Sequence, residues 1–152
     1  MGLREWLLRQ PREPDLVQLK AVEFEGDELV AAVGEAHYQP ALRALCGSDR
    51  WEDVRCDVRA VLVPEPDNPH DPNAVMVQVD QQHVGYLSRG DAIDYGDAIA
   101  TLFSYGWVIV CDARISGRGP GSETPNLGIF LQMFSPDEAL DRALAWLQQQ
   151  PS

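Results

Sequence analysis

The clearest pattern along the chain is an alternation of apolar and polar residues over positions 54–63. Apolar side chains occupy every second position there, and the charged residues Arg55, Asp57 and Arg59 lie between them. Such alternation is typical of a strand that buries one face and exposes the other to water. We therefore expect a half-buried strand near the middle of the chain.

Further apolar runs predict more strands, because they are short, rich in β-branched and aromatic residues, and bounded by turn-forming residues. They cover residues 29–33, 74–79, 83–87, 107–115 and 127–133. The connection at residues 80–82 is so short that the strands on either side of it should form a hairpin.

Helical spacing of apolar residues marks other segments instead. Residues 40–45 begin with Pro40 in the first turn and are followed by Gly47, a typical helix end. Residues 88–103 begin with Ser88, and residues 135–149 begin with Ser135, followed by Pro and an acidic residue. Both serines are suited to cap the first turn of a helix.

The order of these elements places too few helices between strands for a doubly wound sheet. We expect an α+β, β-rich fold, a small OB-like or partly open β-barrel of about six strands with two or three helices. Residues 29–133 form the predicted domain and residues 134–152 a C-terminal helix. Residues 1–28 form an N-terminal extension, with a short helix at residues 3–9 that contains Trp6 and an acidic linker at residues 23–28.

The charge balance limits the classes of partner. The chain has 24 acidic and 12 basic residues, a net charge of −12 with neutral histidines. Such an excess repels phosphate backbones and anionic membranes at long range, so a nucleic-acid site must depend on local residues. No apolar run approaches the roughly 18 residues of a membrane helix. We expect a cytoplasmic protein with no membrane partner.

The cysteines carry a second prediction about the compartment. Cys46, Cys56 and Cys111 are odd in number and widely spaced, and no C-x-x-C motif occurs. A disulfide framework and a Cys-rich zinc site are both disfavoured by this pattern. We expect three buried thiols in a reducing compartment.

The densest polar cluster is the segment E-P-D-N-P-H-D-P-N-A-V at residues 65–75. Its Asp and Asn side chains can bond to nearby backbone N–H groups, and its prolines fix φ. The composition predicts a rigid loop that presents polar side chains, although a plain turn between strands fits it as well. Two smaller clusters are V-G-E-A-H-Y at residues 33–38 and V-G-Y-L-S-R at residues 84–89, which also fit a strand-to-helix turn and a hairpin strand.

In this order and spacing, the three clusters resemble the HIRAN domain family. The match is carried by V-G-E-A-H-Y, then P-D-N-P-H-D-P-N-A-V, then V-G-Y-L, within about residues 29–133. Members occur fused to helicase-like remodelling ATPases and as freestanding bacterial proteins. The resemblance implies a DNA-binding module that grips a single-stranded 3′ end in a pocket of an OB-like barrel.

The resemblance also implies roles for particular residues. Asp71 would accept the terminal 3′-hydroxyl, and its carboxylate would repel a continuing phosphate. His37 and Tyr38 take the positions of an aromatic pair that holds bases, and each stacked base is worth about 1–3 kcal/mol. The candidate DNA-binding residues are His37, Tyr38, Asn68, His70, Asp71, Asn73, Tyr86 and Arg89.

A local basic face would help such a module despite the acidic total. The arginines of the predicted domain are the candidates: Arg43, Arg50, Arg55, Arg59, Arg89, Arg114 and Arg118. Each of them is equally compatible with an ordinary solvated surface charge.

Two other functions remain open. One is an acidic protein-interaction module that keeps the fold without binding DNA, using the Trp6 segment and the apolar stripe of the C-terminal helix. The other is a divalent-metal or hydrolytic site at Asp67, His70, Asp71 and His83. Because no H-x-x-x-H, G-x-S-x-G or P-loop motif occurs, we expect no enzyme and no cofactor. A motor or nuclease acting with this chain in DNA repair would be a separate protein.

Overall fold

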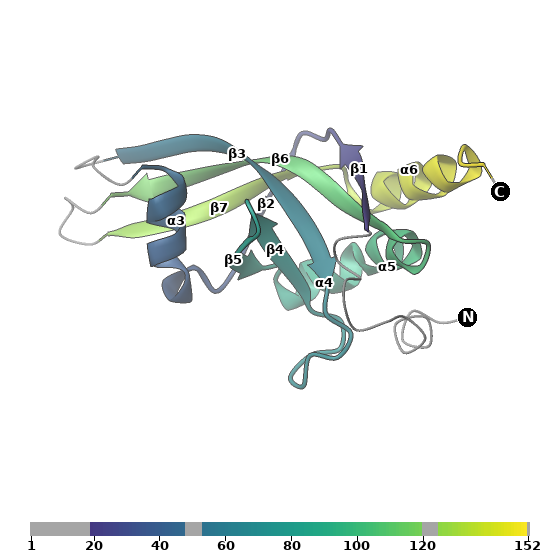
Figure 1. Ribbon diagram of the computed structural model, residues 1–152, viewed down its shortest axis with the longest axis horizontal. Helices are drawn as coiled ribbons and strands as arrows, with labels where there is room; N and C mark the ends of the chain where they lie inside the picture. The colour runs from purple at the N-terminus through teal and green to yellow at the C-terminus, as the bar shows by residue number, and fades with distance from the viewer. Residues whose placement is uncertain (1–18, 48–52, 120–124, 152) are drawn as a thin grey trace.

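One strongly bent sheet forms the centre of the molecule (Figure 1). The computed structural model describes residues 19–47, 53–119 and 125–151. In these residues the sheet has seven strands in the order β2-β7-β6-β3-β4-β5, with β1 beside β6. The strands are β1 (Lys20–Phe24), β2 (Glu28–Ala31), β3 (Asp53–Pro64), β4 (Val75–Val79), β5 (Gln82–Tyr86), β6 (Trp107–Arg118) and β7 (Asn126–Met133).

The sheet curls until its two edge strands meet. Just after β2, Val33 and Tyr86 of β5 form an isolated antiparallel bridge, with N···O distances of 2.7 and 3.0 Å. Gly85 permits this approach, because a Cβ at its position would lie 3.0 Å from the carbonyl oxygen of Val33. A single bridge closes the curve without a full ladder. The predicted β-rich, partly open barrel is therefore confirmed.

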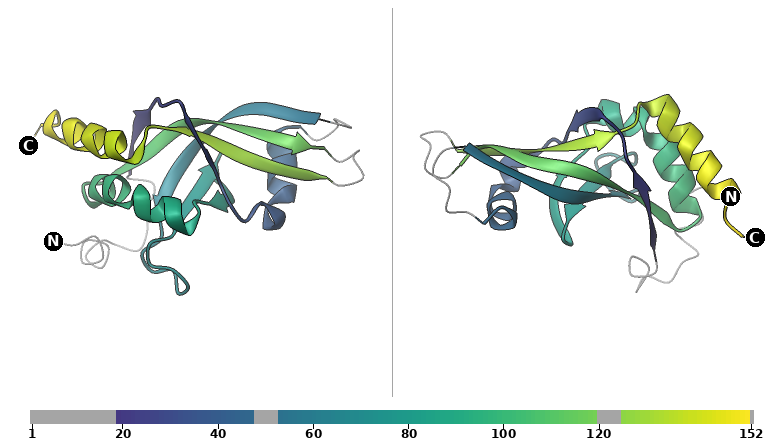
Figure 2. Two further views of the ribbon diagram at one scale, coloured as in Figure 1. Left: turned by 180° about the vertical axis from the view of Figure 1, so that it is seen from behind. Right: turned by 90° about the horizontal axis from the view of Figure 1, so that it is seen from above.

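The helices gather at the two ends of the sheet (Figure 2). A 3₁₀ turn, η1 (Glu35–His37), leads into α3 (Gln39–Leu45) at one end, where Leu42 is fully buried. At the other end α5 (Gly96–Ser104) and α6 (Pro136–Gln148) lie side by side, and α4 (Arg89–Asp94) precedes α5. Within the described ranges, no helix is both long and apolar enough to cross a membrane.

The predicted helix at residues 88–103 is in fact two helices. Ser88 caps the first as expected, because its Oγ accepts the Asp91 N–H at 3.1 Å. The break falls at Tyr95, whose buried side chain donates its hydroxyl proton to the Phe134 carbonyl at 2.7 Å. Gly96 follows directly, and glycine weakens a continuous helix. The helix count therefore exceeds the predicted two or three.

The acidic linker predicted at residues 23–28 is wrong for its first part. Lys20–Phe24 forms β1, which runs parallel to β6, and Val22 and Phe24 are buried while Glu23 is exposed. Glu23 and Glu25 alternate with buried apolar residues, so the acidity of this segment does not by itself indicate a linker. The predicted helix at residues 3–9 lies outside the described residues, and the boundaries at residues 28/29 and 133/134 stay predictions.

The expectation of three free thiols is also wrong. Cys46 and Cys56 form a disulfide with a Cα–Cα distance of 5.9 Å, and Cys111 is free and buried. Cys46 ends α3 and Cys56 lies on β3, so the bond ties this helix to the sheet. Linear spacing does not reveal that the helix end returns to this strand. Burial, and next the charge of Asp112, raise the pKa of Cys111 to about 12.

The disulfide gives a simple labelling prediction. Iodoacetamide should modify one cysteine per chain when protein purified without reductant is unfolded, because Cys111 is the thiol left over. Prior reduction should raise the labelling to all three, as measured by intact mass. Labelling of all three cysteines without reduction would contradict the disulfide.

Candidate nucleic-acid interface

Three rings from two neighbouring elements pack against one another where the barrel is bridged. Tyr38 follows η1, and His83 and Tyr86 belong to β5. The ring centres of Tyr38 and His83 lie 4.5 Å apart, and those of His83 and Tyr86 lie 4.7 Å apart. His37 meets the Tyr38 ring edge-on at 6.4 Å. We call Tyr38, His83 and Tyr86 the ring cluster.

Hydrogen bonds fix the middle ring of the cluster. His83 Nε2 lies 3.0 Å from the Gly85 carbonyl oxygen, and the Tyr38 hydroxyl lies 3.4 Å from His83 Nδ1. A carbonyl can only accept, so Nε2 carries a proton and donates it, which leaves Nδ1 to accept from Tyr38 when the ring is neutral. His83 therefore helps to fix the position of the Tyr38 ring.

Glu65, at the start of the loop after β3, lies beside two phenols. The pKa of Tyr86 is raised to about 12, first by burial and then by a hydrogen bond to the Glu65 carboxylate and by its charge. The pKa of Tyr38 is raised by burial and by the charge of Glu65. Both phenols therefore keep their protons at neutral pH. Glu65 is not among the DNA-binding residues that the motifs predict.

The raised pKa of Tyr86 predicts a loss of stability in alkali. Between pH 10, the ordinary tyrosine pKa, and about pH 12 the unfolded chain loses a proton that folded Tyr86 keeps. The folded state then binds more protons, so the free energy of unfolding falls as pH rises. Urea denaturation at pH 9 and pH 11 should show a smaller fall for Tyr86→Phe than for the wild type. An equal fall would contradict the assignment.

The loop at residues 65–74 is fixed by its own side chains, as its composition predicts. Asn68 Oδ1 accepts the backbone N–H groups of His70 at 2.9 Å and Asp71 at 3.2 Å, and its Nδ2 donates to Glu65 at 3.3 Å. Asp71 Oδ1 accepts the Asn73 N–H at 2.9 Å. One carboxylate oxygen of Asp71 is thus used within its own turn.

The predicted DNA-binding residues fall into three groups. A continuous series of contacts runs from His37 through the ring cluster and Glu65 to Asn68. Asp71 and Asn73 join this series through the loop, in which His70 is exposed. Arg89, exposed at the first residue of α4, has no contact with the ring cluster among the described residues.

The residues of the alternative metal site do not gather. His83 belongs to the ring cluster, whereas Asp67, His70 and Asp71 belong to the loop. Across the described ranges, no group of three His, Cys, Asp or Glu side chains is placed to hold a metal ion.

Gln39 anchors residues 34–39, which we call the Tyr38 arm, to the sheet. Its Nε2 donates to the Leu127 carbonyl at 2.8 Å, and its Oε1 accepts the Leu127 N–H at 2.9 Å. The side chain thus pairs with β7 as a neighbouring strand would. Gly34, with φ at +83°, supplies the turn that starts the arm. The sequence held no signal for the role of Gln39, because a glutamine before proline is unremarkable.

The arginines predicted to form one basic face do not all lie together. Arg59 is paired with Glu23 at 2.7 Å and Asp112 at 3.2 Å, so its charge is balanced. Arg43 lies on α3, and Arg50 lies outside the described residues. Three arginines do gather, Arg55, Arg114 and Arg118, on the face of the sheet that α3 does not cover.

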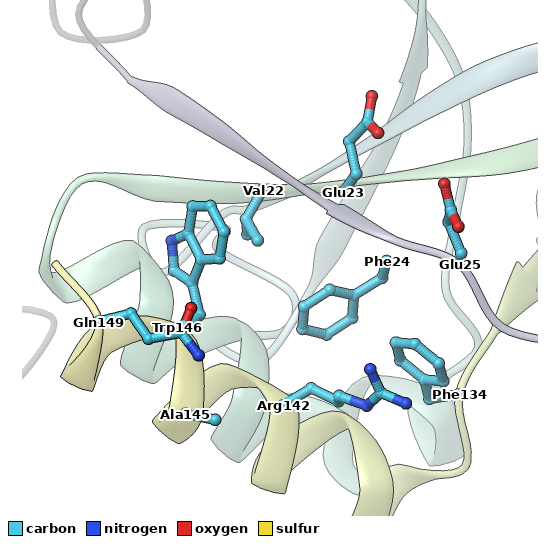
Figure 3. Close-up of a pocket in the computed structure, with 9 residues that line it drawn as sticks. All are labelled: Val22, Glu23, Phe24, Glu25, Phe134, Arg142, Ala145, Trp146 and Gln149. Carbon is cyan, nitrogen blue, oxygen red and sulfur yellow. The ribbon is translucent and has the colours of Figure 1, made fainter.

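A hollow of about 490 Å³ lies between β1 and α6, with Phe24 and Trp146 on its walls (Figure 3). The Arg142 guanidinium lies 4.6 Å from the Phe134 ring centre and pairs with Glu138 at 3.2 Å. Because the two glutamates Glu23 and Glu25 outnumber Arg142 in its lining, the hollow does not suit a phosphate.

A model of the HIRAN domain matches residues 30–112, a range that holds the Gly34, Asp71 and Gly85 motifs. The chain belongs to the HIRAN domain family. Among solved structures, this HIRAN chain is similar to the crystal structure of the HIRAN domain of human HLTF, with 18% identity, 79% of this chain and 87% of that chain covered, and a TM-score of 0.35.

A second similar structure is the NMR structure of the HLTF HIRAN domain in its DNA-bound conformation. The identity is 21%, the coverage 62% of this chain and 87% of that chain, and the TM-score 0.25. A search of curated proteins finds no match. Assignment of the chain to the HIRAN family therefore stands on the family match and its motifs.

Proposed function

We propose that this HIRAN chain is a non-catalytic module that binds single-stranded DNA and takes the 3′-hydroxyl end at the ring cluster, beside the Asp71 loop. The observation that carries the proposal is the continuous series from His37 through the ring cluster to Glu65 and Asn68. It brings rings from two motifs, with His83 between them, to a rigid acidic loop from a third.

The chemistry of the loop favours an end over an interior position. Glu65, Asp67 and Asp71 are carboxylates within one short loop, and the Asp71 Oδ2 has no partner among the described residues. Carboxylates accept hydrogen bonds from a hydroxyl but repel a phosphate. Aromatic rings can stack on any base, whatever the sequence. The site therefore suits a terminal nucleotide that ends in a free hydroxyl.

Fluorescence anisotropy with short labelled oligonucleotides tests the proposal. The wild type should bind a strand with a free 3′-hydroxyl more tightly than the same strand with a 3′-phosphate. Asp71→Asn should reduce the difference in affinity between the 3′-hydroxyl and the 3′-phosphate strand. The amide lacks the negative charge, but its Oδ1 can still accept the Asn73 N–H. Asp71→Ala also loses that turn bond and serves as the comparison. Equal affinity for hydroxyl, phosphate and blunt duplex ends would refute end capture.

A second candidate function is an acidic protein-interaction module. A groove of about 610 Å³ lies between α5 and α6, with Tyr105 70% exposed and Leu144 44% exposed. Exposed apolar surface of this kind often marks a protein contact. Failure to retain any oligonucleotide in a gel shift, together with a partner lost on Leu144→Asp, would select this function.

A further inference from the structure

Three arginines line one groove on the outer face of the sheet. Its volume is about 550 Å³, and Arg55 of β3, Arg114 and Arg118 of β6, and Phe130 of β7 form its walls. The strand register aligns them, since Arg55 pairs with Ser116 and Arg114 pairs with Phe130. No helix of the described residues covers this face (Figure 2). We call this the arginine groove.

The charge of the arginine groove opposes that of the molecule. Three of the eight basic residues in the described ranges line it, against one acidic residue, Asp53, whereas the whole chain has 24 acidic and 12 basic residues. Asp57 bonds to Arg114 Nε at 3.1 Å but is itself 81% exposed. Such an exposed pair is worth about 1 kcal/mol or less and yields readily to a phosphate.

Exposed apolar side chains also line the arginine groove. Leu29 of β2 is 69% exposed, and Phe130 is partly exposed at the groove wall. Single-strand binding sites combine a basic track for the backbone with rings on which bases stack. The groove offers both, and a purely acidic peptide would leave Phe130 and Leu29 without a use.

The groove lies on the opposite face of the sheet from the Tyr38 arm. Gln39 bonds to Leu127, and Leu127 pairs with Gly117 in the groove lining. β2 pairs with β7 at residues 130–133, so beside Leu127 the neighbour of β7 is the Gln39 side chain rather than another strand. A DNA single strand can pass from one face of the sheet to the other around this end of β7. Barrels of the OB class bind about 4–16 nucleotides, which is enough to reach both faces.

We propose that the arginine groove binds the phosphate backbone of a DNA single strand whose 3′ end lies at the ring cluster. This rests on the proposed function, but it adds a separate contact. The net charge of −12 is then no obstacle, because the backbone meets a local basic track.

Anisotropy titrations with a 20-nucleotide and a 5-nucleotide strand, both with free 3′ ends, test the groove. Arg55→Ala and Arg118→Ala should each reduce the salt slope of 20-nucleotide binding by about 0.7 and leave 5-nucleotide binding unchanged. Arg59→Ala, on the same strand and face as Arg55 but paired with two carboxylates, should change neither. Circular dichroism melts confirm that each variant folds.

The outcomes separate the two proposals. Unchanged slopes in both groove variants, with 20-nucleotide binding intact, overturn the groove and leave end capture standing. If Arg55→Ala and Arg118→Ala weaken binding of the 20-nucleotide and the 5-nucleotide strand equally, the groove is not a separate contact and the proposal is also overturned. No binding of either strand by the wild type refutes both proposals. Competition by polyglutamate as strong as by the 20-nucleotide strand would identify the groove as an acidic-peptide site instead.

Discussion

Replacing Tyr38 with alanine is expected to weaken binding of a single strand with a free 3′-hydroxyl by about ten- to a hundredfold. The Tyr38 ring packs on His83 at 4.5 Å and meets the His37 ring at its edge, so it lies at the centre of the predicted stacking surface. A stacked base contributes about 1–3 kcal/mol, and 1.4 kcal/mol is a factor of ten. Anisotropy titration at fixed salt measures the change.

Matched variants separate stacking from a general loss of structure. Tyr38→Phe keeps the ring and loses the 3.4 Å contact to His83, so its affinity should fall far less than that of Tyr38→Ala. Tyr105→Ala removes a tyrosine that is 70% exposed at the other end of the sheet and should bind like the wild type. Equal affinities for the Tyr38→Ala and Tyr105→Ala variants would show that the ring cluster holds no base.

The strands and helix starts were predictable because their signals are local. Alternation over residues 54–63 indicates β3, whose charged positions Arg55, Asp57 and Arg59 are exposed as expected. The two-residue turn before β5 forms without glycine, since Asp80 and Gln81 adopt φ values of 49° and 65°. Ser135 caps α6 by accepting the Glu138 N–H at 3.3 Å, as the capping motif predicts.

Other features depend on contacts between distant segments, which periodicity does not report. Glu65 reaches Tyr86 across the start of β4, which pairs with both β3 and β5, and Gln39 reaches Leu127 across 88 positions. The motifs place Tyr38 and Tyr86 in the site, but His83 enters only through its ring contacts. From the sequence alone His83 is a candidate metal ligand, because a histidine in isolation carries no sign of its neighbours.

The net charge misleads for a related reason. A total of −12 describes the field far from the surface, whereas a bound strand meets individual side chains. The ion pairs of Arg59 and Arg114 show that several acidic residues on the outer sheet face are used to balance arginines. The acidic loop and the arginine groove lie on different parts of the chain. A strand bound to both would have its hydroxyl end and its phosphates read by opposite charges.

Phe24→Ala is expected to lower the free energy of unfolding by about 3–5 kcal/mol. Phe24 is 3% exposed in β1, and its ring centre lies 5.3 Å from that of Phe134. Removing the ring leaves a cavity between the sheet and α6. Because a domain is typically stable by about 5–15 kcal/mol, the loss should be plain in urea denaturation.

The matched control lies one position along the chain. Glu25→Ala changes an exposed side chain next to Phe24 and should alter stability by about 0.5 kcal/mol or less. If residues 23–28 were the solvated linker that their acidity suggests, both substitutions would be equally mild. A difference of several kcal/mol between the two variants would show that β1 packs against the core, because adjacent residues of a half-buried strand point to opposite faces.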